Sequence, residues 1–134
     1  MKILIVDDEL NNRLLLKKLL TGVGQCDMVS SGQDALVLFE HALGENTPYD
    51  LICMDIMMPG IDGLECIRRM RELEKETEVP PSSESIILMV SALDSPQTVV
   101  EAFRKGGCTD YLTKPISRDK LFSKLLEYDL ISSQ

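Results

Sequence analysis

The sequence has 134 residues, of which 44% are apolar, so it is long enough and apolar enough for one globular domain with a sizeable core. Its 22 acidic residues outnumber its 14 basic ones, and the formal net charge of −8 argues against direct binding of nucleic acid or of an anionic membrane. The same acidic excess suggests that some of the carboxylates gather around a cation.

The cysteines and the N-terminus restrict the class of protein further. The four cysteines contain no C-x-x-C pair, and His41 is not near any of them in the sequence, so a zinc site is not expected. Buried thiols in a reducing compartment are the preferred interpretation, and a disulfide stays open. The stretch MKILIVDDE is too short and too acidic for a signal peptide, and no apolar run approaches a membrane span. We therefore expect a cytoplasmic protein.

The first half of the chain alternates apolar runs with amphipathic stretches. It predicts, in chain order, a strand over 2–6, a helix over 10–24, a strand over 26–30, a helix over 33–44, a strand over 50–54 and a helix over 63–76. Gly22 and Gly24 are stop signals for the first helix, and Gly44 ends the second. Ser30 or Ser31 is expected to cap the second helix.

The second half continues the alternation. It predicts a strand over 85–90, a helix over 95–107, a strand over 109–113 and a helix over 117–130. Pro96 is expected in the first turn of the fourth helix. The polar segment 73–85, which contains Pro80 and Pro81, is expected to be a mobile excursion between the third helix and the fourth strand.

Five successive strand–helix units predict an α/β fold. Strands that are apolar throughout are typical of a parallel sheet covered by helices on both faces. The expected architecture is a flavodoxin-like, doubly wound sheet of five strands in the order 2-1-3-4-5 with five helices. We found no internal repeat and expect a single domain over 1–134, because the chain after Lys114 has room for one helix only.

Polar residues stand where the predicted strands end. In chain order these are Asp7, Asp8 and Glu9, then Asp55, then Ser91, then Lys114. Ligands of open α/β sheets bind outside the carboxyl ends of the strands, so we expect these side chains to meet. Carboxylates held close together repel one another, and Mg²⁺ is the cation that an all-oxygen set favours. Mg²⁺ indicates phosphoryl chemistry, in which an aspartate can act as the covalent nucleophile.

Each of these residues also has an ordinary structural interpretation when it is taken alone. Asp7 or Asp8 could cap the first helix, Asp55 could be a turn former before Pro59, and Lys114 could be solvated. Their conjunction at one edge of the sheet favours a functional site. The arginines of the third helix, Arg68, Arg69 and Arg71, alternate with glutamates and are expected to form a solvated face.

At these positions the sequence resembles the receiver domain of two-component response regulators. The motifs that carry the resemblance are IVDDE, DIMMPGIDG, VSALD and DYLTKPI, in this order and each at a predicted strand end. The resemblance covers essentially the whole chain. Each motif alone is weak, and the four together are highly specific.

The resemblance implies a role for each site residue. Asp55 would be the phosphoacceptor, assisted by Lys114 and Ser91. Asp8 and Asp55 would ligate Mg²⁺ together with the backbone carbonyl of Met57, and Asp7 would act partly through water. Ser91 would also be the switch hydroxyl and Tyr111 the switch aromatic, although a tyrosine in a strand is more often a packing residue. The Lys114–Pro115 peptide bond would be cis.

The resemblance also implies partners. A phosphohistidine on a sensor histidine kinase or on a histidine phosphotransfer protein would donate to Asp55. Ser91 would then move toward the phosphoryl group and Tyr111 would move inward, which is a population shift between two packings. The fourth helix, fifth strand and fifth helix would bind a downstream protein. The chain would be a monomer or a weak phosphorylation-dependent dimer, and it would catalyse only its own phosphorylation and dephosphorylation.

Departures from the family pattern lead to one further hypothesis. Ser91 stands where threonine is commoner, and Cys108 where alanine is. Met57 and Leu93 are apolar where many members have polar residues, so we expect slow self-dephosphorylation, because apolar groups hinder an attacking water. The competing function is an interaction or adaptor module of the same fold that is never phosphorylated. A flavodoxin, a haloacid-dehalogenase-type phosphatase and a P-loop NTPase each need a motif that this sequence lacks.

Overall fold

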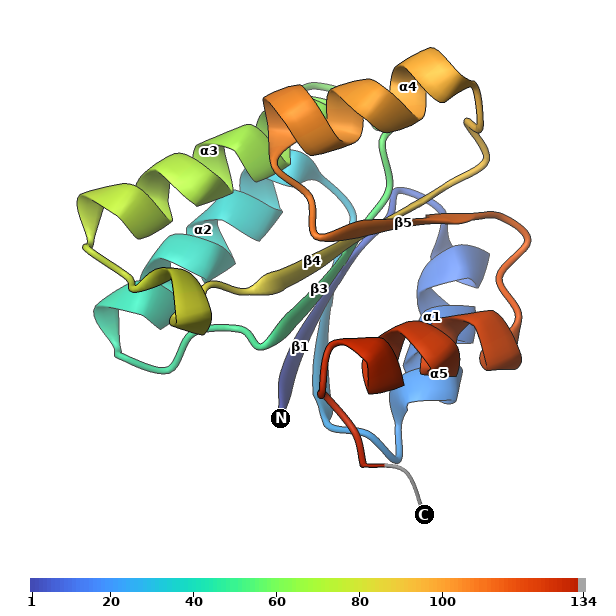
Figure 1. The fold of residues 1–134 in the computed structure, drawn as a ribbon, viewed down its shortest axis with the longest axis horizontal. Coiled ribbons are helices and arrows are strands. Elements are labelled where there is room, and N and C mark those ends of the chain that lie inside the picture. The colour runs from blue at the N-terminus through green and yellow to red at the C-terminus, as the bar shows by residue number, and fades with distance from the viewer. Residues whose placement is uncertain (133–134) are drawn as a thin grey trace.

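The computed structural model describes residues 1–132 and consists of a parallel five-stranded sheet with helices on both faces (Figure 1). The strand order is β2-β1-β3-β4-β5, which confirms the predicted fold class and topology. The strands are β1 (Lys2–Val6), β2 (Gln25–Val29), β3 (Leu51–Met54), β4 (Ile86–Ser91) and β5 (Asp110–Thr113). The predicted domain extends to residue 134, and residues 133–134 lie outside the described part of the chain.

The central strands β1, β3 and β4 are almost entirely apolar because both faces of the sheet are covered there, whereas the edge strands β2 and β5 carry polar residues such as Asp27 and Asp110. Successive side chains of a strand point to opposite faces. Ile3, Ile5, Leu51 and Cys53 belong to one buried cluster, with α1 and α5. The alternate positions of the same strands, such as Leu4, belong to a second cluster with residues of α2 and α3 and with Ala102, which follows α4. Burial on both faces therefore explains why the strand sequences show no polar alternation.

The five helices divide between these two faces, as Figure 1 shows. Helices α1 (Leu10–Leu20) and α5 (Arg118–Glu127) cover one face, and α2 (Gly32–Gly44), α3 (Gly63–Glu76) and α4 (Pro96–Glu101) cover the other. Ser31 caps α2, Asp62 caps α3, Ser95 caps α4 and Ser117 caps α5, each through a side-chain oxygen that accepts from a backbone N–H. None of the helices among residues 1–132 combines the length and the apolarity that a membrane span requires.

Three helices differ from their predicted extent by more than one residue, and one of them, α5, ends at Glu127 rather than at residue 130. Helix α1 ends at Leu20 rather than residue 24, because the chain turns there to enter β2. Gly24 passes the N-terminal residue so closely that a Cβ on it would lie 2.5 Å from the carbonyl oxygen of Met1. The predicted helix 95–107 has two parts: α4 proper, and a π-helical turn over Ala102–Gly106.

The helix predicted over 63–76 is confirmed, so the polar excursion begins after Glu76, and its far end is fixed to the core. Helix α3 continues to Glu76, and a short 3₁₀ helix (Pro81–Ser83) follows. Glu74 is 1% exposed and accepts a hydrogen bond from the backbone N–H of Ser85 at 2.8 Å. The connection is therefore tied to the core at its far end.

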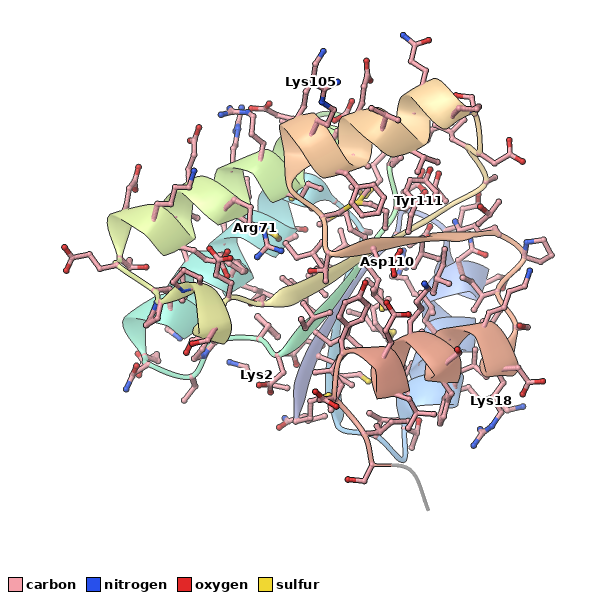
Figure 2. The ribbon with its side chains drawn as sticks, viewed as in Figure 1. Lys2, Lys18, Arg71, Lys105, Asp110 and Tyr111 are labelled. Carbon is pink, nitrogen blue, oxygen red and sulfur yellow. The ribbon has the colours of Figure 1, made fainter. Side chains whose placement is uncertain are left out.

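The prediction that all three arginines of α3 are solvated is wrong for one of them. The side chain of Arg71 is 16% exposed, and Figure 2 shows it between α3 and the sheet. Arg68 and Arg69 are more exposed and pair with Glu65 on the outer surface of α3, as expected.

Candidate functional site

Asp55 is a buried carboxylate directly after β3. Its residue is 7% exposed, and its Oδ1 accepts a hydrogen bond from the backbone N–H of Ile56 at 2.8 Å. The chain then leaves through a loop that closes again on Asp55, because Gly63 donates its N–H to the carbonyl of Ile56 at 2.8 Å. A Cβ on Gly63 would lie 2.0 Å from the carbonyl oxygen of Asp55. Only glycine fits this approach, so Gly63 helps to position Asp55.

Asp7 and Asp8 follow β1, which pairs with β3. The carboxylate of Asp7 accepts the backbone N–H of Glu9 at 2.9 Å, and the carbonyl of Asp7 accepts Nη1 of Arg13 at 2.7 Å. Asp7 is buried, whereas Asp8 is exposed. Asp7 does not cap α1 by a hydrogen bond into the helix, since the N-cap position is Glu9 and has no side-chain cap. The alternative capping interpretation therefore does not account for these acids.

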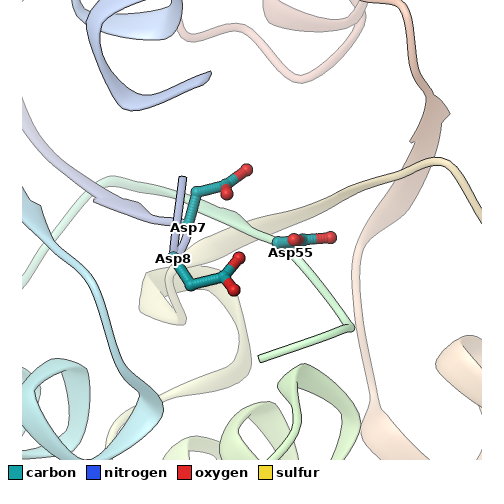
Figure 3. Close-up of side chains that lie close together, drawn as sticks. All are labelled: Asp7, Asp8 and Asp55. Atoms are coloured by element: carbon teal, nitrogen blue, oxygen red, sulfur yellow. The ribbon is translucent and has the colours of Figure 1, made fainter. Parts of the chain in front are cut away.

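The carboxylates of Asp7, Asp8 and Asp55 meet at the ends of β1 and β3, as Figure 3 shows. One oxygen of each lies within 4.8 Å of the others. Three carboxylates at this separation repel one another unless a cation lies between or beside them. The side chains that the sequence analysis singled out are thus brought together by the sheet.

Lys114, at the end of β5, supplies a cation. Its Nζ lies 2.8 Å from Oδ2 of Asp7 and 3.6 Å from Oδ2 of Asp55. Burial by itself would lower the pKa of Lys114, but the hydrogen bond to Asp7 and the charge of Asp55 outweigh it, so the pKa is raised. Lys114 is therefore a charged ammonium in the site. The peptide bond to Pro115 is cis, as the family resemblance implied.

Burial and charge act on Asp55 in opposite directions. Burial raises the pKa of its carboxyl group, Lys114 lowers it, and the neighbouring charge of Asp7 raises it again. The net pKa is raised. The ionised carboxylate is thus held in an unfavourable place, and a positive charge near it would stabilise it.

Ser91 and Tyr111 lie beside this cluster on β4 and β5. Ser91 is 1% exposed, and its Oγ accepts the N–H of Leu93 at 3.2 Å. Tyr111 is half-buried, and its hydroxyl donates to the carbonyl of Leu93. Burial raises the pKa of Tyr111. Both predicted switch residues therefore contact the same residue of the β4–α4 loop. Tyr111 does more than pack, although its role in switching stays a prediction.

The donor set fits Mg²⁺. It consists of carboxylate oxygens, which are the ligands that Mg²⁺ prefers. Both oxygens of Asp7 already accept hydrogen bonds, one from Glu9 and one from Lys114. Asp7 is thus less free than Asp8 to bind a metal directly, in agreement with the expected contact through water. Met57 lies two residues after Asp55 with its side chain 64% exposed, and the role of its carbonyl stays a prediction.

Residues that the sequence analysis missed hold the site together. Arg13 and Gly63 act on the backbone of Asp7 and Asp55, respectively. A glycine directly after the capping Asp62, as the first residue of an amphipathic helix, was the available signal for the close approach of Gly63. Arg13 had no such signal, because a contact from a helix to the preceding loop is not visible as a period or motif.

A family model for the response regulator receiver domain matches residues 3–126. The chain belongs to this family. It is 33% identical over 129 residues to the two-component response regulator ORR41 of Oryza sativa subsp. japonica, which covers 96% of the chain and 94% of that protein. It is 34% identical over 128 residues to the hybrid signal transduction histidine kinase L of Dictyostelium discoideum, which covers 95% of the chain but 7% of that protein.

Solved receiver structures agree with this assignment. The receiver domain of the histidine kinase CKI1 from Arabidopsis thaliana, complexed with Mg²⁺ and BeF₃⁻, matches with a TM-score of 0.81 at 28% identity, covering 96% of the chain and 89% of that domain. A chain of the CheX–CheY–BeF₃–Mg²⁺ complex from Borrelia burgdorferi matches with a TM-score of 0.82 at 25% identity, covering 98% and 90%.

These comparisons establish the receiver as a module of two-component signalling. Receivers of this family are generally signalling modules rather than enzymes, and they interact with histidine kinases or phosphotransfer proteins. The chain spans nearly all of the rice relative but only a small part of the hybrid kinase. What the longer relatives do as whole proteins is not transferred to this chain.

Proposed function

We propose that this receiver accepts a phosphoryl group on Asp55 and acts as a phosphorylation-dependent switch in two-component signalling. One observation carries the proposal: a buried aspartate lies beside two further carboxylates and 3.6 Å from the ammonium of Lys114, all at strand ends. A nucleophile, a cation site and a positive charge are what phosphoryl transfer to a carboxylate needs. The Mg²⁺ complexes of the two related receivers support the metal assignment.

In the proposed reaction a carboxylate oxygen of Asp55 attacks the phosphorus of a phosphohistidine on a histidine kinase or phosphotransfer protein. The O–P bond forms, the P–N bond breaks, and the electron pair returns to the imidazole, which takes a proton from solvent. Asp8, Asp55 and the carbonyl of Met57 would hold Mg²⁺, with Asp7 partly through water. When bound, this ion would supply charge neutralisation at the phosphoryl oxygens.

Lys114 and Ser91 stabilise the product in this proposal. The ammonium of Lys114 leaves Asp7 and pairs with a phosphoryl oxygen, and the hydroxyl of Ser91 donates a hydrogen bond to another. A movement of Ser91 toward the phosphoryl group would disturb its contact with Leu93, to which Tyr111 is also bonded. The β4–α4 loop and Tyr111 would move as a consequence. The surface of α4, β5 and α5 is thereby proposed to change for a downstream protein.

The test is the intact mass of the protein after incubation with acetyl phosphate and Mg²⁺. We expect one added phosphoryl group, lost when Mg²⁺ is omitted and absent in Asp55→Asn. The matched control is Asp34→Asn, an exposed aspartate in the first turn of α2, which should keep the adduct. If acetyl phosphate fails although Mg²⁺ binds, a phosphohistidine protein replaces it as donor. No adduct from either donor, together with no Mg²⁺ binding, would favour the phosphorylation-independent adaptor.

A further inference from the structure

The helical segment formed by α4 and the π-helical turn after it is packed against the protein at its end but not at its beginning. None of the residues of its first part, Pro96–Glu101, is buried. In the π-helical turn that follows, Ala102 and Gly106 are buried. Gly106 packs so closely on α3 that a Cβ there would lie 2.6 Å from Cδ1 of Ile67. Packing therefore fastens the C-terminal end of this helical segment and leaves its beginning free.

Arg71 of α3 fastens the same end by hydrogen bonds. Its Nε donates to the carbonyl of Gly107 at 2.8 Å, and its Nη2 donates to Oγ1 of Thr109 at 3.3 Å. Gly107 has the left-handed φ of 79° and closes the segment before β5. Figure 2 shows Arg71 reaching from α3 toward the chain between α4 and β5. One guanidinium thus holds Gly107 and Thr109, both in the connection that leads from the π-helical turn to β5.

The guanidinium of Arg71 is itself fixed by contacts with Glu74 and Ser85. Its Nη1 pairs with Oε1 of Glu74 at 2.8 Å and donates to the carbonyl of Ser85 at 2.9 Å. Glu74 is 1% exposed, and its other carboxylate oxygen accepts the N–H of Ser85. A buried charge that loses its partner is strongly unfavourable, so this pair resists opening. The guanidinium is therefore a rigid anchor rather than a surface contact.

The free beginning of α4 is connected to the phosphorylation site. It follows Leu93, whose N–H donates to Ser91 and whose carbonyl accepts from Tyr111. The anchored part is itself a π-helical turn that begins at Ala102, directly after α4, and such turns interrupt the regular hydrogen bonds of a helix. A displacement that starts at Ser91 thus enters α4 at its exposed end and reaches this interruption where the anchored part begins.

We propose that Arg71 is a positioning residue that makes Gly107 a fixed pivot, so that phosphorylation moves residues 95–101 of α4 while 102–107 stay in place. The proposal rests on the proposed function of Asp55. A partner that reads the phosphorylated state would accordingly read the first half of α4, which includes the exposed Val100. Arg71 touches no reacting atom and acts only through the end of α4.

The test is amide hydrogen exchange, resolved by residue, with and without Mg²⁺ and BeF₃⁻ as the phosphoryl analogue. In the wild-type chain we expect exchange at Val99–Glu101 to change by about tenfold and exchange at Gly106–Cys108 by less than about twofold. In Arg71→Met the change should reach Gly106–Cys108, at about tenfold as well. Arg69→Met is the matched control, because Arg69 lies on the exposed side of α3 and pairs only with Glu65. It should behave as the wild-type chain.

Exchange at the amides of Ile56 and Ser91 reports on the site itself and separates the two proposals. No change there in the wild-type chain would overturn the proposed function and the pivot with it. A change there that extends equally to Gly106–Cys108 in the wild-type chain would overturn the pivot alone, as would an Arg71→Met pattern identical to the wild-type one. If Arg71→Met does not fold, Arg71→Lys serves instead. It keeps the charge beside Glu74, but its single ammonium cannot replace the planar fork of donors, so the same spread is expected.

Discussion

At the scale of one residue, Asp55 combines burial with a negative charge that the fold stabilises only in part. Its carboxylate is buried although charge is unfavourable there, and the N–H of Ile56 and the ammonium of Lys114 compensate only in part. A packing residue at the end of β3 would not need these partners. The unfavourable position agrees with the proposed role of this carboxylate as a phosphoacceptor beside a cation site.

Replacing this carboxylate by its neutral isostere should stabilise the protein. The pKa of Asp55 is raised in the folded state, so the folded chain binds the proton more tightly than the unfolded chain. Ionisation of Asp55 thus lowers stability as pH rises above its ordinary pKa of 3.8. We expect Asp55→Asn to raise the free energy of unfolding in urea at neutral pH by about 1 kcal/mol. The gain should vanish at pH values below 3.8, where both chains are neutral at this position.

Asp34→Asn is the control for this measurement, since Asp34 is exposed and its replacement should change stability by less than about 0.5 kcal/mol. An Asp55→Asn variant that is less stable than the wild-type chain at neutral pH would show that the carboxylate is stabilising, contrary to the geometry described.

The flanking residues Met57 and Leu93 are predicted to slow the loss of the phosphoryl group. Both line a shallow open pocket with Asp8, and apolar side chains there hinder an attacking water. We expect Met57→Gln to shorten the lifetime of the aspartyl phosphate by about tenfold, equivalent to ~1.4 kcal/mol of barrier. The decay of the phosphorylated mass species after removal of donor measures this. Val37→Gln, an equally exposed apolar position on α2, should leave the lifetime unchanged.

A wild-type lifetime on the order of seconds would contradict the hypothesis, because water would then reach the site freely. An unchanged lifetime in Met57→Gln would contradict the role of this side chain.

At the scale of elements, β5 and α5 are joined by Asp110. Its Oδ2 lies 2.8 Å from Nζ of Lys124 and accepts the hydroxyl of Tyr128 at 2.7 Å, both from the end of α5. Its Oδ1 accepts the N–H of Tyr111 at 2.8 Å. Burial by itself would raise the pKa of Asp110, but the hydrogen bonds from Lys124 and Tyr128 outweigh it, and the pKa is lowered. The ionised carboxylate therefore stabilises the docking of α5 beside the switch tyrosine.

This contact should depend on pH. Because the folded-state pKa of Asp110 is depressed, its contribution is complete above the ordinary pKa of 3.8 and is lost as pH falls through the lower folded value. We expect Asp110→Asn to lower the free energy of unfolding at neutral pH by about 2 kcal/mol, as for hydrogen bonds to a charged group. Urea unfolding across the acid range would show the difference from the wild-type chain shrinking toward zero.

Glu127→Gln is the matched control, because Glu127 is the exposed second partner of Lys124 and should matter little. A difference between Asp110→Asn and the wild-type chain that is constant across pH would contradict the ionic account.

At the scale of the whole molecule, the two-sided sheet buries the thiols. All four cysteines are free, and Cys53, Cys66 and Cys108 are buried. Burial raises the pKa of each of these three thiols to about 12. Cys26, on the edge strand β2, is half-buried, and burial raises the pKa of its thiol as well. Burial in the folded chain is thus the main cause of these raised pKa values, whether the cysteine lies in a strand, in α3 or in the connection before β5.

We therefore expect an aromatic disulfide reagent to modify Cys26 alone, and slowly, in the native protein at neutral pH, and all four thiols after unfolding. A Cys26→Ser variant should abolish the native reaction. A reducing agent should leave the melting temperature unchanged, since no cross-link is present to reduce. Rapid reaction of the buried thiols in the native state, or a melting temperature that falls on reduction, would contradict this.

The class of fold, and the meeting of Asp7, Asp55 and Lys114, could be predicted from the sequence. Central strands that are almost entirely apolar require a sheet covered on both faces, and these three residues stand where strands end. Parallel strands deliver their carboxyl ends to one edge, so these positions had to meet. Local periodicity also located the helices, and it erred at their ends, where α1 stops at Leu20 and α4 changes to a π-helical turn.

Which charged residues of α3 are buried and bonded to other segments is visible only in the folded chain. In the sequence, Arg71 and Glu74 are indistinguishable from the solvated charges around them, since all of them follow one another along the same helix. Their partners Ser85 and Gly107 lie far along the chain, and no period or motif connects positions that meet only when loops pack. The contacts of Arg13 with Asp7 and of Gly63 with Asp55 are closer in sequence, but they too depend on how a loop folds back rather than on a period or motif. Burial of these groups depends on contacts between distant segments, and such contacts exist only in the folded chain.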